Sequence, residues 1–317
     1  MFLEKSRFSI AMSWIRRFNN IRQRDWADVA NYWAEFGRDF DTADFLRDSL
    51  EDAIESIFNR KTEAENTVQI VEIEQRRPFV SELVYSQIKA NHALMCAAQQ
   101  IASGSSTWGV TDAYHSSMLL MRSILAAFGV FVCRVQDRNI LIDAFPWFGR
   151  IDDQKKFKRR HRNWEKCAAV ISCTSQNFGQ SDLYSLFQRV LTVSTVPSEL
   201  WPEAIVRNLI ATSKSHFSSS RNRLIYGSRF WFQPDDLLGE CLSIDWMNPG
   251  KRSIDVYDFA KTTSSSELDC YCDCWVLFRM SRKLHEAIYQ SLANTLDVFG
   301  YVDVRRGSIR LIERQFS

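Results

Sequence analysis

The scarcity of glycine and proline constrains the fold of this chain more than any other sequence feature. The 317 residues include only 11 Gly and 6 Pro. These two residue types mark most turns and helix ends, so a chain with few of them makes few turns and long regular elements. Long elements favour helices, and the chain is therefore predicted to be mainly α, folded as a helical bundle.

The spacing of apolar residues predicts where the helices lie. Trp26, Val29, Tyr32 and Trp33 recur at helical spacing, and Gly37 is a natural helix end. Residues 67–74 fit either a short strand or a helix end, residues 104–109 a loop, and residues 143–153 a connection. Further helices are predicted over residues 48–60, 81–102, 111–133, 181–190, 203–213, 216–232 and 264–299.

Three regions follow from this pattern. Residues 1–76 form an N-terminal helical region, residues 77–238 a helical domain, and residues 239–317 a C-terminal helix followed by a β-hairpin. The helix over 111–133 is apolar around most of its circumference, so it is expected at the centre of the bundle. The tail alternates polar and apolar residues and has Gly307 at a turn position, which predicts strands over 301–305 and 308–314.

Charge and cysteine content exclude several classes of protein. The net charge of +2 restricts any nucleic-acid contact to a local basic patch. No apolar run reaches the roughly 18 residues of a membrane span, and the N-terminus lacks a signal-peptide pattern, so a cytoplasmic protein with no membrane partner is expected. None of the eight Cys forms a C-x-x-C pair, and no His has metal-ligand spacing. We therefore expect reduced cysteines, no metal site and no cofactor.

One short segment, from Lys155 to Trp164, is strongly basic. Phe157 and Trp164 flank or interrupt the charges and are suited to stacking on bases, while the cations are suited to phosphates. A solvated surface or an interface to an acidic partner protein explains the same pattern. The candidate nucleic-acid-binding residues of this segment are Lys155, Lys156, Lys158, Arg159, Arg160 and Arg162.

The stretch SSSRNRLIYGSRF carries the one pattern that suggests a reaction. Arg221 is followed by the amide of Asn222, and four residues separate Arg221 from Tyr226. Together with the preceding helical pair, this R-N-x-x-x-[H/Y] pattern resembles the HEPN superfamily of prokaryotic defence and toxin–antitoxin proteins. The resemblance covers about residues 81–235. Tyr226 stands where the family has its histidine.

The resemblance implies a dimer in which the motifs of both copies meet at one cleft and cleave RNA without a metal. In that chemistry the arginine, here Arg221, holds the scissile phosphate while a base activates the ribose 2′-hydroxyl. A tyrosine with a pKa of about 10 is a poor base near neutral pH, although it donates hydrogen bonds well. His216 is the candidate substitute base, and His115 and Arg122 on the helix over 111–133 are expected to face the same cleft.

Three functions therefore remain open from the sequence. The first is an RNA-binding effector that acts as a metal-independent endoribonuclease through Arg221, Tyr226 and His216. The second is a catalytically inactive scaffold or sensor in a larger defence assembly, which the tyrosine at the histidine position favours. The third is a helical regulator whose C-terminal hairpin grips DNA through Arg305, Arg306, Arg310 and Arg314.

Overall fold

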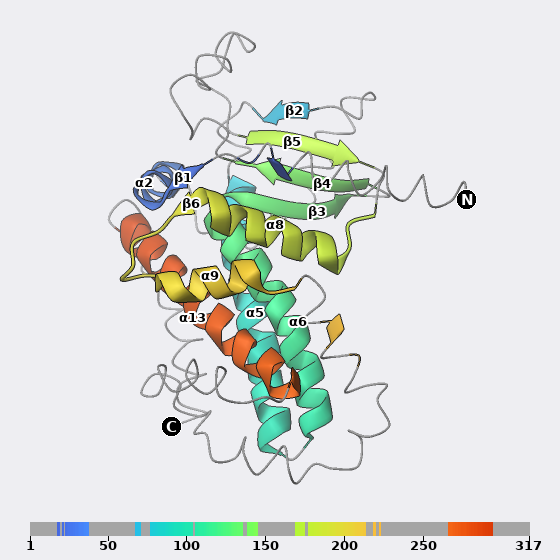
Figure 1. Ribbon diagram of the computed structural model, residues 1–317. Coiled ribbons are helices and arrows are strands. Elements are labelled where there is room, and N and C mark those ends of the chain that lie inside the picture. Colours follow the sequence, from blue (N-terminus) through green and yellow to red (C-terminus); the bar gives the residue numbers. More distant parts are fainter. Residues whose placement is uncertain are drawn as a thin grey trace, which may run out of the picture. The chain divides into compact units, whose positions relative to one another are not determined.

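The computed structural model describes twelve helices and strands and the short connections beside them (Figure 1). The residues that the structure describes are 18–19, 21, 23–37, 67–70, 77–103, 105–135, 138–144, 169–174, 177–213, 218–219, 222 and 266–293. The helix predicted from Asp48 and the hairpin predicted over 301–314, with its four arginines, lie outside these residues.

Helices make up most of the described part of the chain, which confirms a mainly α protein. The helices are α2 (Trp26–Gly37), α5 (Arg77–Ala102), α6 (Ser106–Ala127), α8 (Gln180–Val193), α9 (Glu203–Ala211) and α13 (Ser266–Ala293). The strands are β1 (Arg24–Asp25), β2 (Thr67–Ile70), β3 (Val130–Val135), β4 (Arg138–Asp143), β5 (Ala169–Thr174) and β6 (Ser194–Thr195).

The chain divides into two compact units, each made of separate segments. Unit 1 comprises residues 1–85, 124–211 and 284–297, and it includes every described strand. Unit 2 comprises residues 86–123, 212–283 and 298–317, and its described part consists mainly of segments of α5, α6 and α13.

A four-stranded sheet organises unit 1. The strands lie in the order β2, β5, β4 and β3, and each pairs antiparallel with its neighbours (Figure 1). Phe131 of β3 packs against two helices: its ring stacks on Phe79 of α5 at 5.2 Å and meets Trp33 of α2 edge-on at 6.5 Å. The Trp33 indole also donates a hydrogen bond to the Ala127 carbonyl at 2.8 Å. The sheet thus packs against α5 and α2, and α2 in turn is joined to the end of α6.

The sheet corrects the prediction that one helix continues from Thr111 to Cys133. Helix α6 ends at Ala127, and Gly129 adopts a positive φ of 71°. A glycine in this left-handed conformation is a common helix stop because it has no Cβ to clash. The apolar run therefore leaves the helix and continues as β3. The interpretation of Asp143 as the start of a connection is also wrong, because Asp143 is the last residue of β4.

Most other predicted elements agree with the structure, with shifted ends. Helices α2, α8, α9 and α13 lie where they were predicted, and β2 resolves the ambiguous stretch as a strand. Helix α5 begins at Arg77, because Pro78 in a first helical turn needs no N–H partner. Part of the predicted loop over 104–109 is helical, since the Gly109 N–H bonds to the Ser105 carbonyl at 2.9 Å and α6 begins at Ser106.

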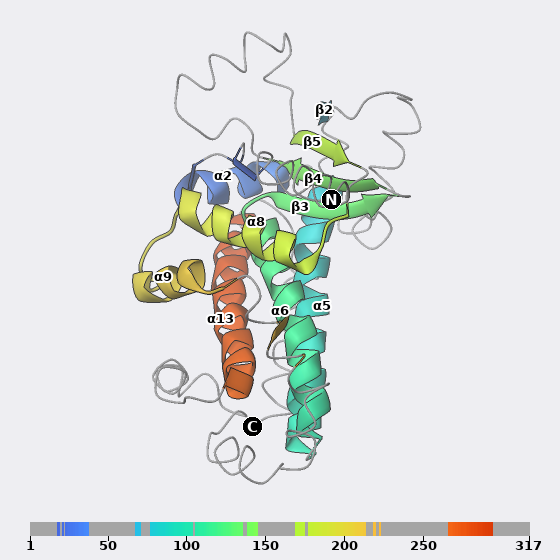
Figure 2. The ribbon, with the colours of Figure 1, turned by 45° about the vertical axis from the view of Figure 1, so that its right-hand side comes forward.

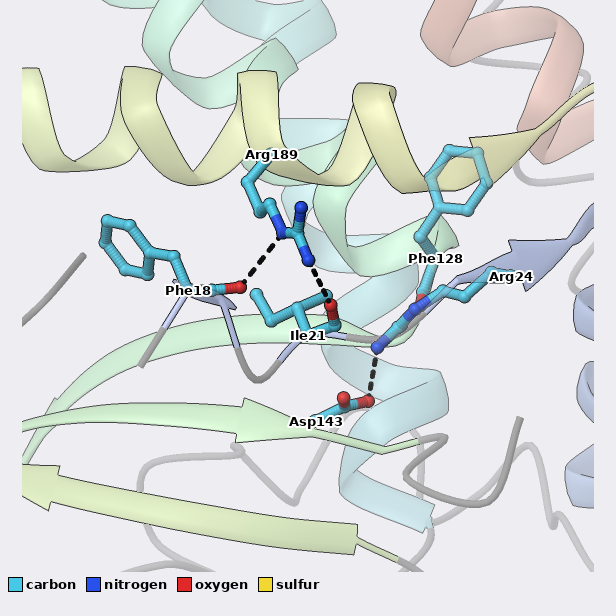
Figure 3. A network of polar contacts seen from close by, with 6 residues as sticks. All are labelled: Phe18, Ile21, Arg24, Phe128, Asp143 and Arg189. Atoms are coloured by element: carbon cyan, nitrogen blue, oxygen red, sulfur yellow. Dashed lines mark hydrogen bonds and ion pairs between the residues drawn. The ribbon is translucent and has the colours of Figure 1, made fainter. Parts of the chain in front are cut away.

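A buried arginine joins three elements of unit 1 (Figure 3). Arg24 of β1 has a fully buried side chain, donates to the Phe128 carbonyl and pairs with the Asp143 carboxylate at 2.5 Å. The Asp143 side chain is 14% exposed. Nearby, Arg189 of α8 donates to the carbonyls of Phe18 at 3.3 Å and Ile21 at 3.2 Å. Two guanidinium groups therefore hold the segment around β1 against α8 and the end of β4.

We expect Asp143→Asn to lower the free energy of unfolding by about 3 kcal/mol, because it removes the carboxylate charge that pairs with a buried guanidinium. Urea denaturation followed by circular dichroism measures this change. Glu203→Gln is the matched control, since it breaks the pair of Glu203 with Arg207, whose side chains are 75% and 72% exposed. That control should stay within about 0.5 kcal/mol of wild type. An equally small effect of Asp143→Asn would contradict the structural role of the Arg24 pair.

A second prediction concerns the end of α6. Gly129→Ala should lower the free energy of unfolding by about 1–2 kcal/mol, because a Cβ disfavours the left-handed backbone conformation. Gly129→Asn should cost less, since asparagine adopts this conformation more readily than alanine. Thermal denaturation of the two variants side by side gives the order, and an alanine variant as stable as wild type would contradict the prediction.

Candidate functional site

Most of the residues that the sequence singled out lie outside the described part of the chain. These are Arg221, Tyr226 and His216 of the motif, and all six basic residues of the segment from Lys155 to Trp164. Asn222 is described, and it is helical and exposed, within unit 2. Ser218 and Ser219 are helical as well, so the described positions agree with the helix predicted over 216–232.

Unit 2 contains the antiparallel helical pair that the sequence predicted. Helices α5 and α6 lie side by side in both views (Figures 1 and 2). The Ser116 hydroxyl of α6 donates to the Ala90 carbonyl of α5 at 3.1 Å, and Gln100 donates to the Asp112 carboxylate at 2.7 Å. Since residue numbers rise along one helix as they fall along the other between these contacts, the two helices run antiparallel.

Helix α13 packs against this pair through polar groups. Ser123 of α6 and Ser281 of α13 share a buried hydrogen bond of 2.9 Å. Seven residues earlier on each helix, the Cys274 thiol interacts with the hydroxyls of Ser116 and Ser117. The equal spacing on both helices shows that α13 runs parallel to α6 in this unit.

Two buried amides on α5 add to the polar interior of unit 2. Gln87 is 2% exposed and Asn91 is 5% exposed, and they lie one helical turn apart. Gln87 Nε2 and Asn91 Oδ1 have no hydrogen-bond partner within the described structure. Each such group costs about 1–3 kcal/mol relative to a satisfied one. Unit 2 therefore keeps polar groups in its interior at a cost to its free energy of unfolding.

Helix α6 exposes three large side chains along one line. Trp108, His115 and Arg122 are spaced seven residues apart, and all three are exposed. Trp108 is 59% exposed, which is the highest value among the large hydrophobic residues that the structure describes. Most other described residues of α6 are buried, which agrees with a helix that is apolar around most of its circumference. His115 and Arg122 share one exposed side of α6, but Arg221 and Tyr226 are not described, so a common cleft stays a prediction.

Lys89 of α5 adds a further cation near this line. It is exposed and directly precedes Ala90, whose carbonyl contacts Ser116 in the middle of α6. Within the described chain neither Lys89 nor Arg122 forms an ion pair. The Asp112 carboxylate, on the same side of α6, accepts the hydrogen bond from Gln100. We call Lys89, Trp108, His115 and Arg122 the α5–α6 strip.

Sequence reasoning named two members of the strip and missed the other two. His115 and Arg122 were identified from the helical pattern, whereas Trp108 fell in the predicted loop over 104–109. The signal was the seven-residue spacing from Trp108 to Arg122, which becomes visible once the helix is extended back to Ser106. Lys89 had no signal of its own, because a single lysine on a predicted helix is ordinary.

The described part of the chain shows neither a metal site nor a membrane span. Among the described residues, no group of three His, Cys, Asp or Glu side chains is arranged to hold a metal ion. None of the described helices is long and apolar enough to cross a membrane.

Comparison with known proteins gives no relative for this chain. No protein-family model, no curated protein and no solved structure matches it. Function must therefore be argued from the residues and the geometry.

Burial protects the Cys274 thiol and raises its pKa from 9.0 to about 11, against the smaller opposing effect of the Ser116 and Ser117 hydroxyls. Because the thiolate is the reactive form, iodoacetamide near pH 8 should label Cys274 only when unit 2 opens. The half-buried Cys96 is the internal control and should be labelled faster. Peptide mass spectrometry of timed samples gives both rates, and equal rates would contradict the buried, protonated thiol.

The same thiol makes stability depend on pH. The folded thiol keeps its proton where the unfolded thiol has lost it, so this group lowers the free energy of unfolding as the pH rises from 9.0 towards 11. Below pH 9 both states are protonated and the group contributes no pH dependence. Urea denaturation at several pH values should show a shallower alkaline loss for Cys274→Ala than for wild type, and parallel curves would contradict this assignment.

Proposed function

We propose that this chain is a HEPN-like, RNA-binding component of a prokaryotic antiphage defence or toxin–antitoxin system, acting in the cytoplasm. The observation that carries the proposal is the set of exposed cations Lys89 and Arg122, which form no ion pair within the described structure. They belong to the same compact unit as Asn222 of the R-N-x-x-x-[H/Y] pattern. Cations without carboxylate partners are suited to bind phosphates.

The antiparallel pair of α5 and α6 supports the proposal as well. The resemblance to the HEPN superfamily rests partly on such a pair preceding the motif helix, and Ser116 and Gln100 hold the pair together in this orientation. The resemblance also implies that two copies, or this chain and a protein partner, complete the site.

Cleavage would use acid–base groups rather than a metal. Arg221 would hold the scissile phosphate while His216 takes the proton of the ribose 2′-hydroxyl. The 2′-oxygen would then bond to phosphorus as a 2′,3′-cyclic phosphate, the bond from phosphorus to the 5′-oxygen would break, and the 5′-oxygen would take a proton from the imidazolium or from water. Tyr226 would donate a hydrogen bond to a phosphate oxygen. The nucleic-acid-binding residues would be Asn222 and the cations of the segment from Lys155 to Trp164.

A non-catalytic scaffold or sensor is the second candidate function. The presence of Tyr226 at the histidine position favours it, because an unperturbed phenol is a weak base near neutral pH. In that case Arg221 and Asn222 would still bind RNA, but the chain would not cut it.

Incubating the purified protein with labelled total RNA in the presence of EDTA tests both functions. If the chain is an effector, wild type cleaves RNA, Arg221→Ala and His216→Ala reduce the rate at least about 100-fold, and Tyr226→Phe has a smaller effect. Arg207→Ala, on the exposed face of α9, is the control and should cleave like wild type.

Binding without cleavage points to the scaffold, provided that Arg221→Ala weakens the binding. The proposed function is wrong if wild type neither binds nor cleaves RNA, alone or after addition of cell extract from phage-infected bacteria.

A further inference from the structure

Three members of the α5–α6 strip are evenly spaced along α6, and their side-chain types indicate which kind of ligand they fit. Seven residues of an α-helix make nearly two full turns, so Trp108, His115 and Arg122 project from the same side of α6. With a rise of about 1.5 Å per residue, neighbouring members are about 10 Å apart along the axis, and the line spans about 20 Å. A linear ligand lying along α6 meets an indole, an imidazole and a guanidinium in turn.

The charge of the strip favours an anionic ligand. Arg122 and Lys89 are exposed without an ion pair in the described structure. Asp112 is the carboxylate nearest in sequence on this side of α6, and its Oδ2 is engaged by the Gln100 amide. Lys89 and Arg122 are thus the two cations that the strip offers to an anionic ligand.

The exposed indole adds a second requirement for the ligand. Trp26, Trp33, Trp201 and Trp275 are all at most 6% exposed, whereas Trp108 is 59% exposed. A flat aromatic surface on the same side of the helical pair as two cations complements an extended ligand that carries flat rings and negative charges together. Nucleotides have this combination, since bases stack on tryptophan and phosphates contact arginine and lysine.

The need for stacking also selects the form of the nucleic acid. The faces of the bases are covered inside a duplex and are accessible only in a single strand. A protein partner fits the strip less well, because protein interfaces centre on clusters of buried aromatic and aliphatic anchors. Among the described residues, only Ile88 and Trp108 are exposed large hydrophobic side chains, which is too few for such a cluster.

We propose that the α5–α6 strip binds single-stranded RNA, with one base stacked on Trp108 and phosphates held by Arg122 and Lys89. This inference rests on the proposed function, which supplies RNA as the ligand, and it adds a binding surface and a preference for single strands. The strip lies on α5 and α6, separate in sequence from the motif around Arg221 and from the basic segment that begins at Lys155.

Fluorescence anisotropy tests the proposal with a labelled RNA of about 12 nucleotides, as a single strand and as a duplex with its complement. Wild type should bind the single strand more tightly. Trp108→Ala should weaken single-strand binding about 5- to 150-fold, and Trp108→Phe should retain most of the affinity. The exposed position of Trp108 makes both substitutions tolerable for folding, which thermal denaturation verifies.

Salt titrations test the phosphate contacts separately. Arg122→Gln and Lys89→Gln should each reduce the slope of log affinity against log salt concentration by about 0.7, as expected for one lost phosphate contact on a single strand. Arg207→Gln removes an exposed arginine on α9 and should leave the slope unchanged. A DNA single strand of the same sequence shows whether the ribose hydroxyl contributes.

Two results would overturn the inference, and they differ in what they say about the proposed function. If RNA binding depends on Arg221 but is unaffected by Trp108→Ala and equal for duplex RNA, the strip is wrong and the proposed function stands. If wild type binds no RNA in any form, both fail.

Discussion

The buried Arg24 guanidinium is the interaction on which the organisation of unit 1 depends. It brings together the strand β1, the carbonyl of Phe128 after α6 and the carboxylate of Asp143 at the end of β4. A charge in this position must be paired, because an isolated ion is far more costly to bury than a neutral group. Placing Arg24 therefore fixes three chain segments at once. Arg24 and Gly129 both act at the junction between α6 and β3. The end of the helix and the start of the strand are therefore fixed at the same place.

Unit 2 shows a different balance of forces. Its helices are joined by hydroxyls, a thiol and amides rather than by apolar side chains alone, and Gln87 and Asn91 are buried with polar atoms that the described structure leaves without partners. Polar contacts are directional, so the pairs of Ser116 with Ala90 and of Ser123 with Ser281 specify which residues face each other. The exposed side of the same helices carries Lys89 and Arg122, which form no ion pair within the described structure. Unit 2 thus combines an interior held by specific polar contacts with an exposed side that carries cations.

The sequence predicted correctly those elements whose apolar residues follow a single spacing along their whole length. The spacing of Trp26, Val29 and Trp33 predicted α2 together with its end at Gly37. The sheet was missed because β4 and β5 are short apolar runs, which a periodicity argument cannot separate from buried helix segments. Arg24 gave no signal either, since its partners are more than 100 residues away. At the candidate site, Trp108 was assigned to a predicted loop. Its alignment with His115 and Arg122 on one helix was therefore missed.

The contact of Ser123 with Ser281 has a consequence for how the chain is made. The two residues are 158 positions apart, and a ribosome adds that many residues in roughly 10–30 s. During this interval the sides of α5 and α6 that α13 later covers have been synthesised without their partner. Nascent surfaces of this kind are bound by chaperones or associate with one another. The packing of α13 on α6 in unit 2 therefore cannot form until at least 158 residues have been added after Ser123.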